Sequence, residues 1–177
     1  MKEIKILSLL CVPSRKGIEF IMYSNVYYNI TKAKAIIKGG SMCPTINGEV
    51  LFEETKDGVI VTAKINGLPK STGLCQGRFF GLHIHSGTSC TGTPEDEFAN
   101  AKSHYNKFNC PHPFHTGDLP PLLENNGFAY MRILVNKFKM RDIIGRVIII
   151  HEMPDDFTSQ PSGNSGTKIA CGRIIPE

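Results

Sequence analysis

Alternating apolar and polar positions along the chain are typical of β-strands. Val59, Val61, Ala63 and Ile65 occupy every second position of residues 59–65, which is the period of a strand with one buried face. The turn signal Asp57-Gly58 precedes this stretch and predicts a hairpin with residues 50–54.

Further segments have the same character. Phe80, Leu82 and Ile84 would share one face of a strand, and the continuous apolar run at residues 147–150 is short and β-branched, as in a buried strand. The remaining strand candidates are residues 33–37, 129–135 and 168–175. Many short strands separated by turns predict an all-β sandwich or barrel.

Two segments lack this alternation of apolar and polar positions. Residues 86–123 have little strand pattern and are rich in Pro, Gly, Cys and His, and residues 153–167 are small and polar. A loop as long as the first is usually functional or disordered, and its His and Cys content favours function.

Composition narrows the class of protein. The chain has 177 residues, of which 41% are hydrophobic and 20% charged, which fits one globular domain and excludes a collagen-like or wholly disordered chain. No apolar run approaches the roughly 20 residues of a membrane span. Residues 1–38 have a net charge of +5 and residues 39–177 of −1, so the bulk of the chain has no basic face suited to nucleic acid.

The N-terminal residues are set apart from this domain. Residues 1–30 are predicted to be a poorly ordered extension, or the product of a start site misassigned upstream of Met22, and residues 31–177 form the domain. The apolar run at residues 6–12 is short for a signal peptide, and no small-residue cleavage pattern follows it. This poor match favours a cytoplasmic location over export.

The histidines are clustered. Five of the six lie between His83 and His115, where uniform scatter would place about one. His83 and His85 are two residues apart on a predicted strand, so their side chains would point to the same face, opposite Phe80, Leu82 and Ile84. An isolated His-x-His pair fits a metal site and an ordinary half-exposed strand equally well.

The irregular segment supplies the other candidate ligands. These are His104, His112, His115 and Asp118, and imidazoles with a carboxylate suit tetrahedral zinc. Four such groups in 15 residues are hard to explain as solvated loop residues. His151, at the end of the strand at residues 147–150, could complete the His83/His85 pair across the sheet.

These motifs resemble the copper/zinc superoxide dismutases of the bacterial type. The resemblance runs from about residue 33 to residue 174 and does not cover residues 1–30. It is carried by these motifs, in this order: Gly39-Gly40, Gly67-Leu68-Pro69, Gly81-Leu82-His83-Ile84-His85, Gly117-Asp118-Leu119-Pro120, His151-Glu152 and residues 163–172, GNSGTKIACG.

The resemblance implies a Greek-key β-barrel or sandwich of about eight antiparallel strands with two active-site loops. It implies one copper and one zinc per chain, with His104 bridging them, Asp155 linking a copper ligand to a zinc ligand, and a Cys90–Cys171 disulfide. The implied copper ligands are His83, His85, His104 and His151. The implied zinc ligands are His104, His112, His115 and Asp118.

The function implied by the resemblance is the disproportionation of superoxide, with His104 and Lys168 as catalytic residues. Lys168 stands where the family usually has Arg, and it keeps the positive charge without the planar fork, so we expect reduced rather than abolished activity. Residues 157–167 carry no charge, so electrostatic steering would be weaker. The oligomeric state stays open, with a homodimer as one option.

Other interpretations compete with this one. The chain could be a non-catalytic homologue that binds copper or zinc for storage, structure or partner docking. A zinc hydrolase is disfavoured because the chain lacks His-Glu-x-x-His. Cys11, Cys43, Cys75 and Cys110 stand outside the implied disulfide as buried or free thiols. Cys110 lies two residues from His112, so it could also form an extra disulfide or compete for zinc.

Overall fold

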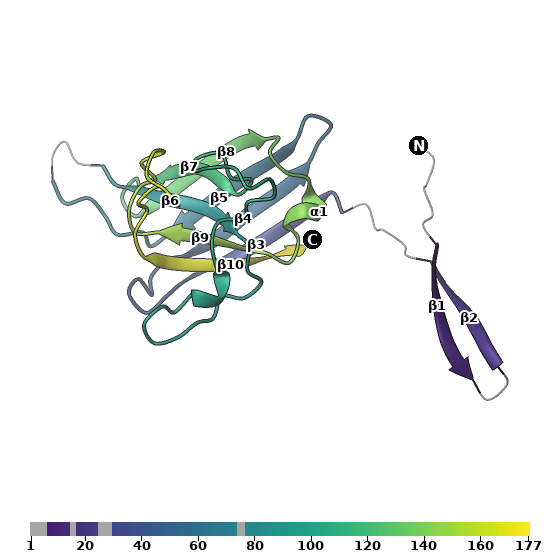
Figure 1. Ribbon diagram of the computed structural model, residues 1–177. Helices are drawn as coiled ribbons and strands as arrows, with labels where there is room; N and C mark the ends of the chain where they lie inside the picture. Colours follow the sequence, from purple (N-terminus) through teal and green to yellow (C-terminus); the bar gives the residue numbers. More distant parts are fainter. Residues whose placement is uncertain (1–6, 15–16, 25–29, 74–76) are drawn as a thin grey trace.

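The computed structural model describes residues 7–14, 17–24, 30–73 and 77–177. Two sheets are present in these ranges, a two-stranded one and an eight-stranded one (Figure 1). The strands of the larger sheet are β3 (Lys32–Gly39), β4 (Asn47–Glu54), β5 (Val59–Asn66), β6 (Phe79–His85), β7 (Asp118–Leu123), β8 (Phe128–Val135), β9 (Val147–His151) and β10 (Lys168–Pro176).

The eight strands form a nearly closed antiparallel barrel. Their order is β7-β6-β9-β10-β3-β4-β5-β8, so β7 and β8 are the two ends of the sheet. Strands β3, β4 and β5 are consecutive neighbours, but the chain then crosses to β6 beyond β10 and β9, which is a Greek-key type of connection. The all-β barrel prediction is confirmed.

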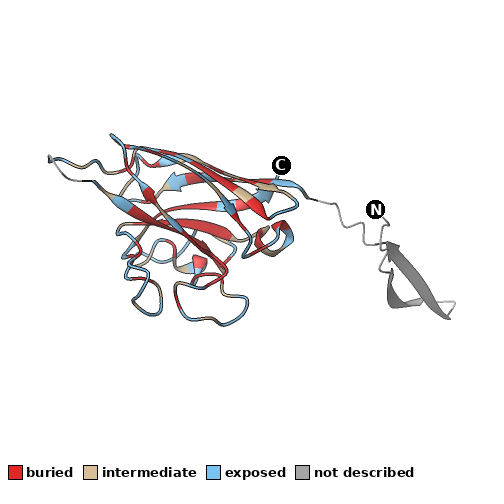
Figure 2. Ribbon diagram, turned by 90° about the horizontal axis from the view of Figure 1, so that it is seen from above, coloured by how far each residue is buried: buried red, intermediate tan, exposed pale blue. Residues whose placement is uncertain are grey.

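The core lies inside the barrel, and it is built from the alternating residues. Val50, Phe52, Val61 and Ile65 are fully buried, while residues between them on β4 and β5, such as Lys64, reach the surface. Figure 2 shows this as buried segments running along the strands and exposed ones gathered in the loops. Period-2 alternation is therefore the pattern of a sheet with one face in the core.

Strand β9 departs from alternation because both of its faces are covered. Ile148 and Ile150 belong to the barrel core, whereas Val147 and Ile149 pack in a second cluster on the outer face. This outer cluster also contains Phe98, Ala101 and Cys171, with Cys90 packed against it. Residues from the long segment after β6 thus cover one side of the barrel, which explains the continuous apolar run.

The prediction that residues 86–123 are irregular throughout is wrong at its end, because β7 occupies Asp118–Leu123. The sequence DLPPLL does not predict a strand, because proline has no backbone N–H to donate to a neighbouring strand. The register with β6 shifts between Phe80 and Leu82, opposite Pro120 and Pro121. An edge strand with a bulge tolerates both prolines because no partner needs their missing N–H groups.

The remaining elements are short. They are the helix α1 (Met140–Ile143), the 3₁₀ turn η1 (Ala99–Ala101) and the hairpin of β1 (Leu7–Ser14) with β2 (Gly17–Ser24). No described helix is long and apolar enough to cross a membrane. The predicted extension at residues 1–30 lies partly outside the described residues, and Cys75 lies wholly outside them. The division into extension and domain stays a prediction.

Candidate metal centre

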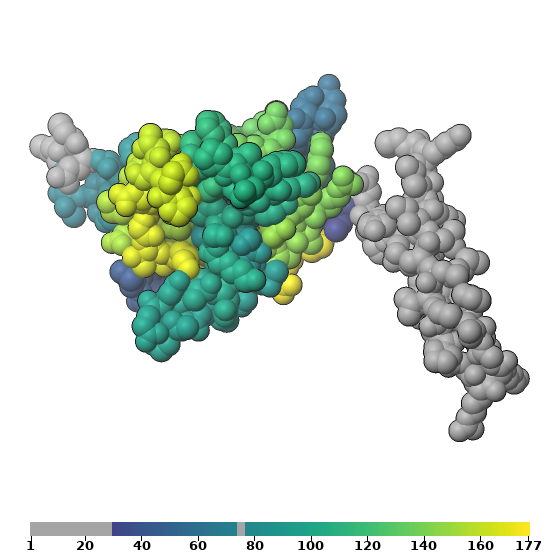
Figure 3. Space-filling model, viewed as in Figure 1, coloured from purple at the N-terminus to yellow at the C-terminus, as the bar shows by residue number. Residues whose placement is uncertain are grey.

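Two loops meet over the outer face of β6 and β9. One is the segment after β6, residues 86–117, and the other is residues 152–167 between β9 and β10. They are tied at Gln160, whose side chain accepts a hydrogen bond from His112 N at 3.0 Å and donates one to His112 O at 2.7 Å. Figure 3 shows the two loops side by side on one face.

The first histidine cluster joins both strands to the long loop. It consists of His83, His85, His104 and His151, all buried, each with a ring nitrogen within 4.8 Å of the others. The register places His83 opposite Ile149 and His85 opposite Val147, which are outer-face residues. His83 and His85 therefore point out of the barrel, as the strand period predicts, but under the loop rather than into solvent.

The second cluster is formed by the loop itself and the first residue of β7. It consists of His104, His112, His115 and Asp118, again buried and within 4.8 Å of one another. The Asp118 carboxylate lies at its centre, with Oδ1 at 2.8 Å from His104 Nδ1 and Oδ2 at 3.1 Å from His112 Nδ1 and 3.3 Å from His115 Nδ1.

His104 belongs to both clusters because its backbone is held against β6. It forms a β-bridge with His85, and the next residue, Tyr105, donates its N–H to Ile84 O at 2.8 Å. The ring lies close to that of His83 and is tilted against it by 34°, with centroids 3.9 Å apart. His104 therefore presents Nδ1 to Asp118 and leaves Nε2 on the side of the first cluster.

In several rings a hydrogen bond fixes the outer nitrogen, which is the one that points away from the centre of its cluster; the other is the inner nitrogen. Asp155 accepts from His83 Nε2 through Oδ2 and from His112 Nε2 through Oδ1, both at 2.8 Å. His85 Nδ1 donates to Lys102 O at 2.8 Å. A proton held at the outer nitrogen leaves the inner nitrogen of a neutral imidazole as a lone pair. Asp155 thus sets the tautomer of one ring in each cluster.

The inner nitrogens are the unsatisfied ones. Among the described residues, the buried side-chain atoms without a hydrogen-bond partner are His83 Nδ1, His104 Nε2, His112 Nδ1 and His115 Nδ1. His85 Nε2 and His151 Nε2 face each other at 3.2 Å. Buried polar groups are rarely left unpaired, so converging lone pairs on fixed rings fit metal ions: four imidazoles for the first cluster, three and a carboxylate for the second.

The protonation states agree with this arrangement. Burial, followed by the neighbouring His83, lowers the pKa of His151 to about 3, and burial also lowers the pKa of His85 well below its usual value. Burial would raise the pKa of Asp118, but the hydrogen bond from His104 and the surrounding imidazoles hold it at about 2. His85 and His151 are thus neutral imidazoles and Asp118 is an ionised carboxylate at neutral pH, the forms that bind metals.

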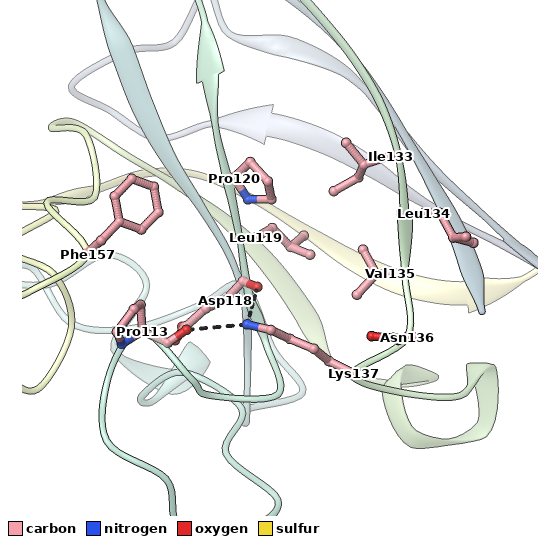
Figure 4. A pocket seen from close by; sticks show the side chains of 10 residues that line it. All are labelled: Pro113, Asp118, Leu119, Pro120, Ile133, Leu134, Val135, Asn136, Lys137 and Phe157. Atoms are coloured by element: carbon pink, nitrogen blue, oxygen red, sulfur yellow. Dashed lines mark hydrogen bonds between the residues drawn. The ribbon is translucent and has the colours of Figure 1, made fainter. Parts of the chain in front are cut away.

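Lys137 supports the second cluster from the end of β8. Its ammonium donates to three backbone carbonyls, Pro113 O, His115 O and Asp118 O, each at 3.3 Å. Two of these bonds are visible in Figure 4, at one side of a pocket of about 380 Å³ between β7 and β8. Nothing in the sequence separates Lys137 from a surface lysine, because its partners are backbone atoms of a distant loop.

Lys168 lies beside the first cluster, but it is not a free cation. The register of β10 and β9 pairs Lys168 with His151, and its charge contributes to the low pKa of that histidine. Its ammonium is 2.5 Å from Asp96 Oδ2 and 3.1 Å from Phe98 O. The sequence reasoning missed Asp96, which comes from the apposed loop.

The cysteines divide as the resemblance implies. Cys90 and Cys171 form a disulfide across 81 residues, which joins the long loop to β10. Cys43 and Cys110 are free and partly buried. Cys110 is outside both clusters of ligand atoms, and its backbone is held by hydrogen bonds with the side chain of Asn106.

Comparisons with known proteins agree with this geometry. The family model "Copper/zinc superoxide dismutase (SODC)" matches residues 46–174. The chain is 31% identical over 142 residues to "Superoxide dismutase [Cu-Zn] 1" of Aquifex aeolicus, covering 72% of this chain and 79% of that one. It is 30% identical over 139 residues to "Superoxide dismutase [Cu-Zn]" of Legionella pneumophila, covering 74% and 79%.

A further sequence match and a structure match are described only as superoxide dismutase-like. "Superoxide dismutase-like protein YojM" of Bacillus subtilis is 33% identical over 118 residues, which are 58% of each chain. The crystal structure of a double mutant of a SOD-like protein from Bacillus subtilis, with a tyrosine and a proline each replaced by histidine, superimposes with a TM-score of 0.64 at 29% identity. The match covers 80% of this chain and 96% of that one.

Proposed function

Because the chain belongs to the copper/zinc superoxide dismutase family, we propose that it converts two superoxide ions and two protons into O₂ and H₂O₂. One observation carries the proposal. His104 has Nδ1 against Asp118 and an unpartnered Nε2 toward the other three histidines, so a single imidazole connects two metal-ligand clusters.

The two clusters would hold different metals. The all-imidazole set His83, His85, His104 and His151 suits copper, and the set with a carboxylate, His104, His112, His115 and Asp118, suits zinc. When bound, copper supplies a one-electron redox couple, and zinc supplies a fixed positive charge.

The chain's own residues supply positioning and a proton site. His104 Nε2 can take up a proton and give it to reduced oxygen while Nδ1 stays oriented by its neighbours in the second cluster. Asp155 keeps the rings of His83 and His112 turned inward. Lys168 is the cation that draws the superoxide anion toward the first cluster, as electrostatic steering does for charged substrates.

The second candidate function is metal binding without dismutation. It is favoured by the similarity to Bacillus subtilis sequence and structure matches that are described only as superoxide dismutase-like. The complete pair of clusters in this chain favours the enzyme, because a storage or structural site needs no imidazole shared between two ligand sets.

Metal analysis combined with a superoxide-consumption assay tests the proposal. The full chain, loaded with copper and zinc, should hold about one of each and consume superoxide catalytically. His104→Asn should retain much of its copper through the other three histidines and lose most of the activity. Zinc binding alone, without activity, would overturn the enzyme and support the metal-binding homologue.

A further inference from the structure

We propose that Asp96 competes with anions for Lys168 and thereby restrains anion access to the first histidine cluster. The inference rests on the proposed function, because it concerns the substrate anion of that site. It begins from the position of Lys168, which pairs with His151 in the register of β9 and β10. A cation there is well placed to meet an anion that approaches the cluster.

The ammonium of Lys168 is already occupied. It lies 2.5 Å from Asp96 Oδ2 and 3.1 Å from Phe98 O. The Lys168 side chain is 17% exposed, whereas that of Asp96 is 44% exposed. The carboxylate therefore stands on the solvent side of the pair, and an incoming anion meets a negative group before it meets the lysine.

The Asp96 carboxylate is held in place by its own turn. Its Oδ1 accepts a hydrogen bond from Phe98 N at 3.1 Å, which leaves Oδ2 for the lysine. Its backbone O accepts from Thr93 N and Ala99 N at 2.9 and 3.0 Å. This turn is fastened to the barrel by the neighbouring Glu97, which accepts from Ser41 N and Oγ at 2.7 and 2.9 Å.

The pair stands at the edge of a hollow of about 490 Å³ between the long loop and the start of β10. Glu95, Asp96 and Glu97 line that hollow together with Lys168. The opposing residues 157–167 have no charge, so no charged group of that segment offsets these three acids. Because Asp96 and the substrate are both anions, they compete for the same ammonium.

The inference differs from a purely supportive role for Asp96. If Asp96 only held Lys168 in position, its removal would weaken anion binding. If it competes, its removal frees the ammonium and strengthens anion binding. The sign of the change therefore separates the two roles.

The test uses the full chain loaded with copper and zinc, and azide as the probe, titrated by its absorption band with copper. Asp96→Asn keeps the oxygen that accepts from Phe98 N and removes the charge. It should tighten azide binding about twofold to fivefold, the range that exposed ion pairs are worth. Superoxide consumption by Asp96→Asn should also fall more steeply with added salt, because an unpaired charge is open to screening.

Two comparisons make the result specific. Glu95→Gln removes an adjacent charge that lines the same hollow, and should change azide affinity less than Asp96→Asn. In a Lys168→Gln background, Asp96→Asn should have almost no effect, because the coupling passes through the lysine. Asp96→Ser provides a second charge-removing variant, and it should change azide affinity in the same direction.

Weaker or unchanged azide binding by Asp96→Asn would overturn the inference, as would an equal shift with Glu95→Gln or a full effect in the Lys168→Gln background. The azide titration does not need turnover. A wild-type protein that shows the copper–azide band but consumes no superoxide would overturn the proposed function alone. A wild-type protein without the band would overturn both.

Discussion

At the scale of single residues, the centre depends on which nitrogen of each ring carries a proton. Asp155 accepts from His83 and His112 at once, and burial of both side chains excludes water as a substitute. Gly163, with a φ of 69°, lies against this contact, and a Cβ there would collide with the Asp155 carboxylate. One carboxylate therefore keeps one ring in each cluster ready to bind.

Replacing Asp155 with Asn should break this arrangement without changing the shape of the side chain. An amide accepts from one imidazole but donates to the other, which forces that ring to carry its proton on the inner nitrogen. We expect a loss of metal affinity of about 10- to 100-fold, measured by competition with a chelator. Asp156→Asn is the control, because the Asp156 carboxylate, in the described part of the chain, bonds only to residues 158 and 159 of its own turn. Equal losses in both variants would contradict the prediction.

Lys137 yields a second prediction at this scale. Its three carbonyl acceptors flank His115 and Asp118, so Lys137→Met should loosen the segment that forms the second cluster. Zinc should dissociate several times faster from the variant, while copper dissociates at the wild-type rate, as followed by transfer of each metal to a chelator. Lys139→Met is a matched change nearby and should have no effect. Parallel loss of both metals would point to general destabilisation instead.

These residues also show what the sequence can reveal about a site. His104, His112, His115 and Asp118 could be predicted as ligands from their clustering in one loop, whereas the copper-ligand assignment of His83, His85 and His151 depended on the family resemblance. Asp155 and the disulfide followed from the family resemblance alone. Lys137 and Asp96 could not be predicted, because a lysine that bonds to backbone carbonyls and an aspartate across a loop leave no local pattern.

At the scale of elements, alternation located the strands that have one face in the core. It failed at β7, where prolines lie opposite a bulge at the sheet edge. The apolar run at residues 147–150 predicted a buried strand, but it could not show which segment covers the outer face of β9. Strand β6 also has one face in the core and the other face covered by a loop. Its inner residues fill the barrel and its outer histidines are buried by residues far along the chain.

The disulfide attaches the segment after β6 to β10, so we expect it to contribute strongly to stability. Cys90 and Cys171 close a loop of 81 residues, and cross-links of this kind are worth about 2–5 kcal/mol. The double variant Cys90→Ala/Cys171→Ala should lose that much free energy of unfolding in urea, measured on metal-free protein so that metal affinity does not contribute. Cys43→Ala, which removes a free thiol, should lose far less. A double variant within 1 kcal/mol of the wild type would contradict the prediction.

At the scale of the whole molecule, the loops packed on the outer face of the barrel leave all six histidines buried, which is costly unless they stay neutral. Folding is therefore coupled to the binding of protons by these histidines. In the unfolded chain each imidazole titrates near its ordinary pKa of about 6.5. In the folded chain, burial lowers the pKa of His83 and His85, and that of His151 to about 3.

Between those two values the unfolded state binds more protons than the folded state, so the stability of the metal-free protein must fall as the pH falls. The loss begins near pH 6.5 and continues toward pH 3. Asp118 and Asp155 act in a lower window, because their pKa of about 2 gives stability that is present above about pH 4 and lost as the pH falls through 2. Urea midpoints of metal-free protein should therefore decrease steadily from pH 7 to pH 4, before the carboxylates contribute.

The variant His151→Gln should have a shallower decrease over the same range, because it removes a buried histidine whose pKa is lowered to about 3. A midpoint that stays level from pH 7 to pH 5 would mean that the histidines are protonated in the folded protein, and the inner nitrogens would then be donors rather than lone pairs. The pH dependence of the empty protein thus tests the same property on which metal binding at both clusters depends.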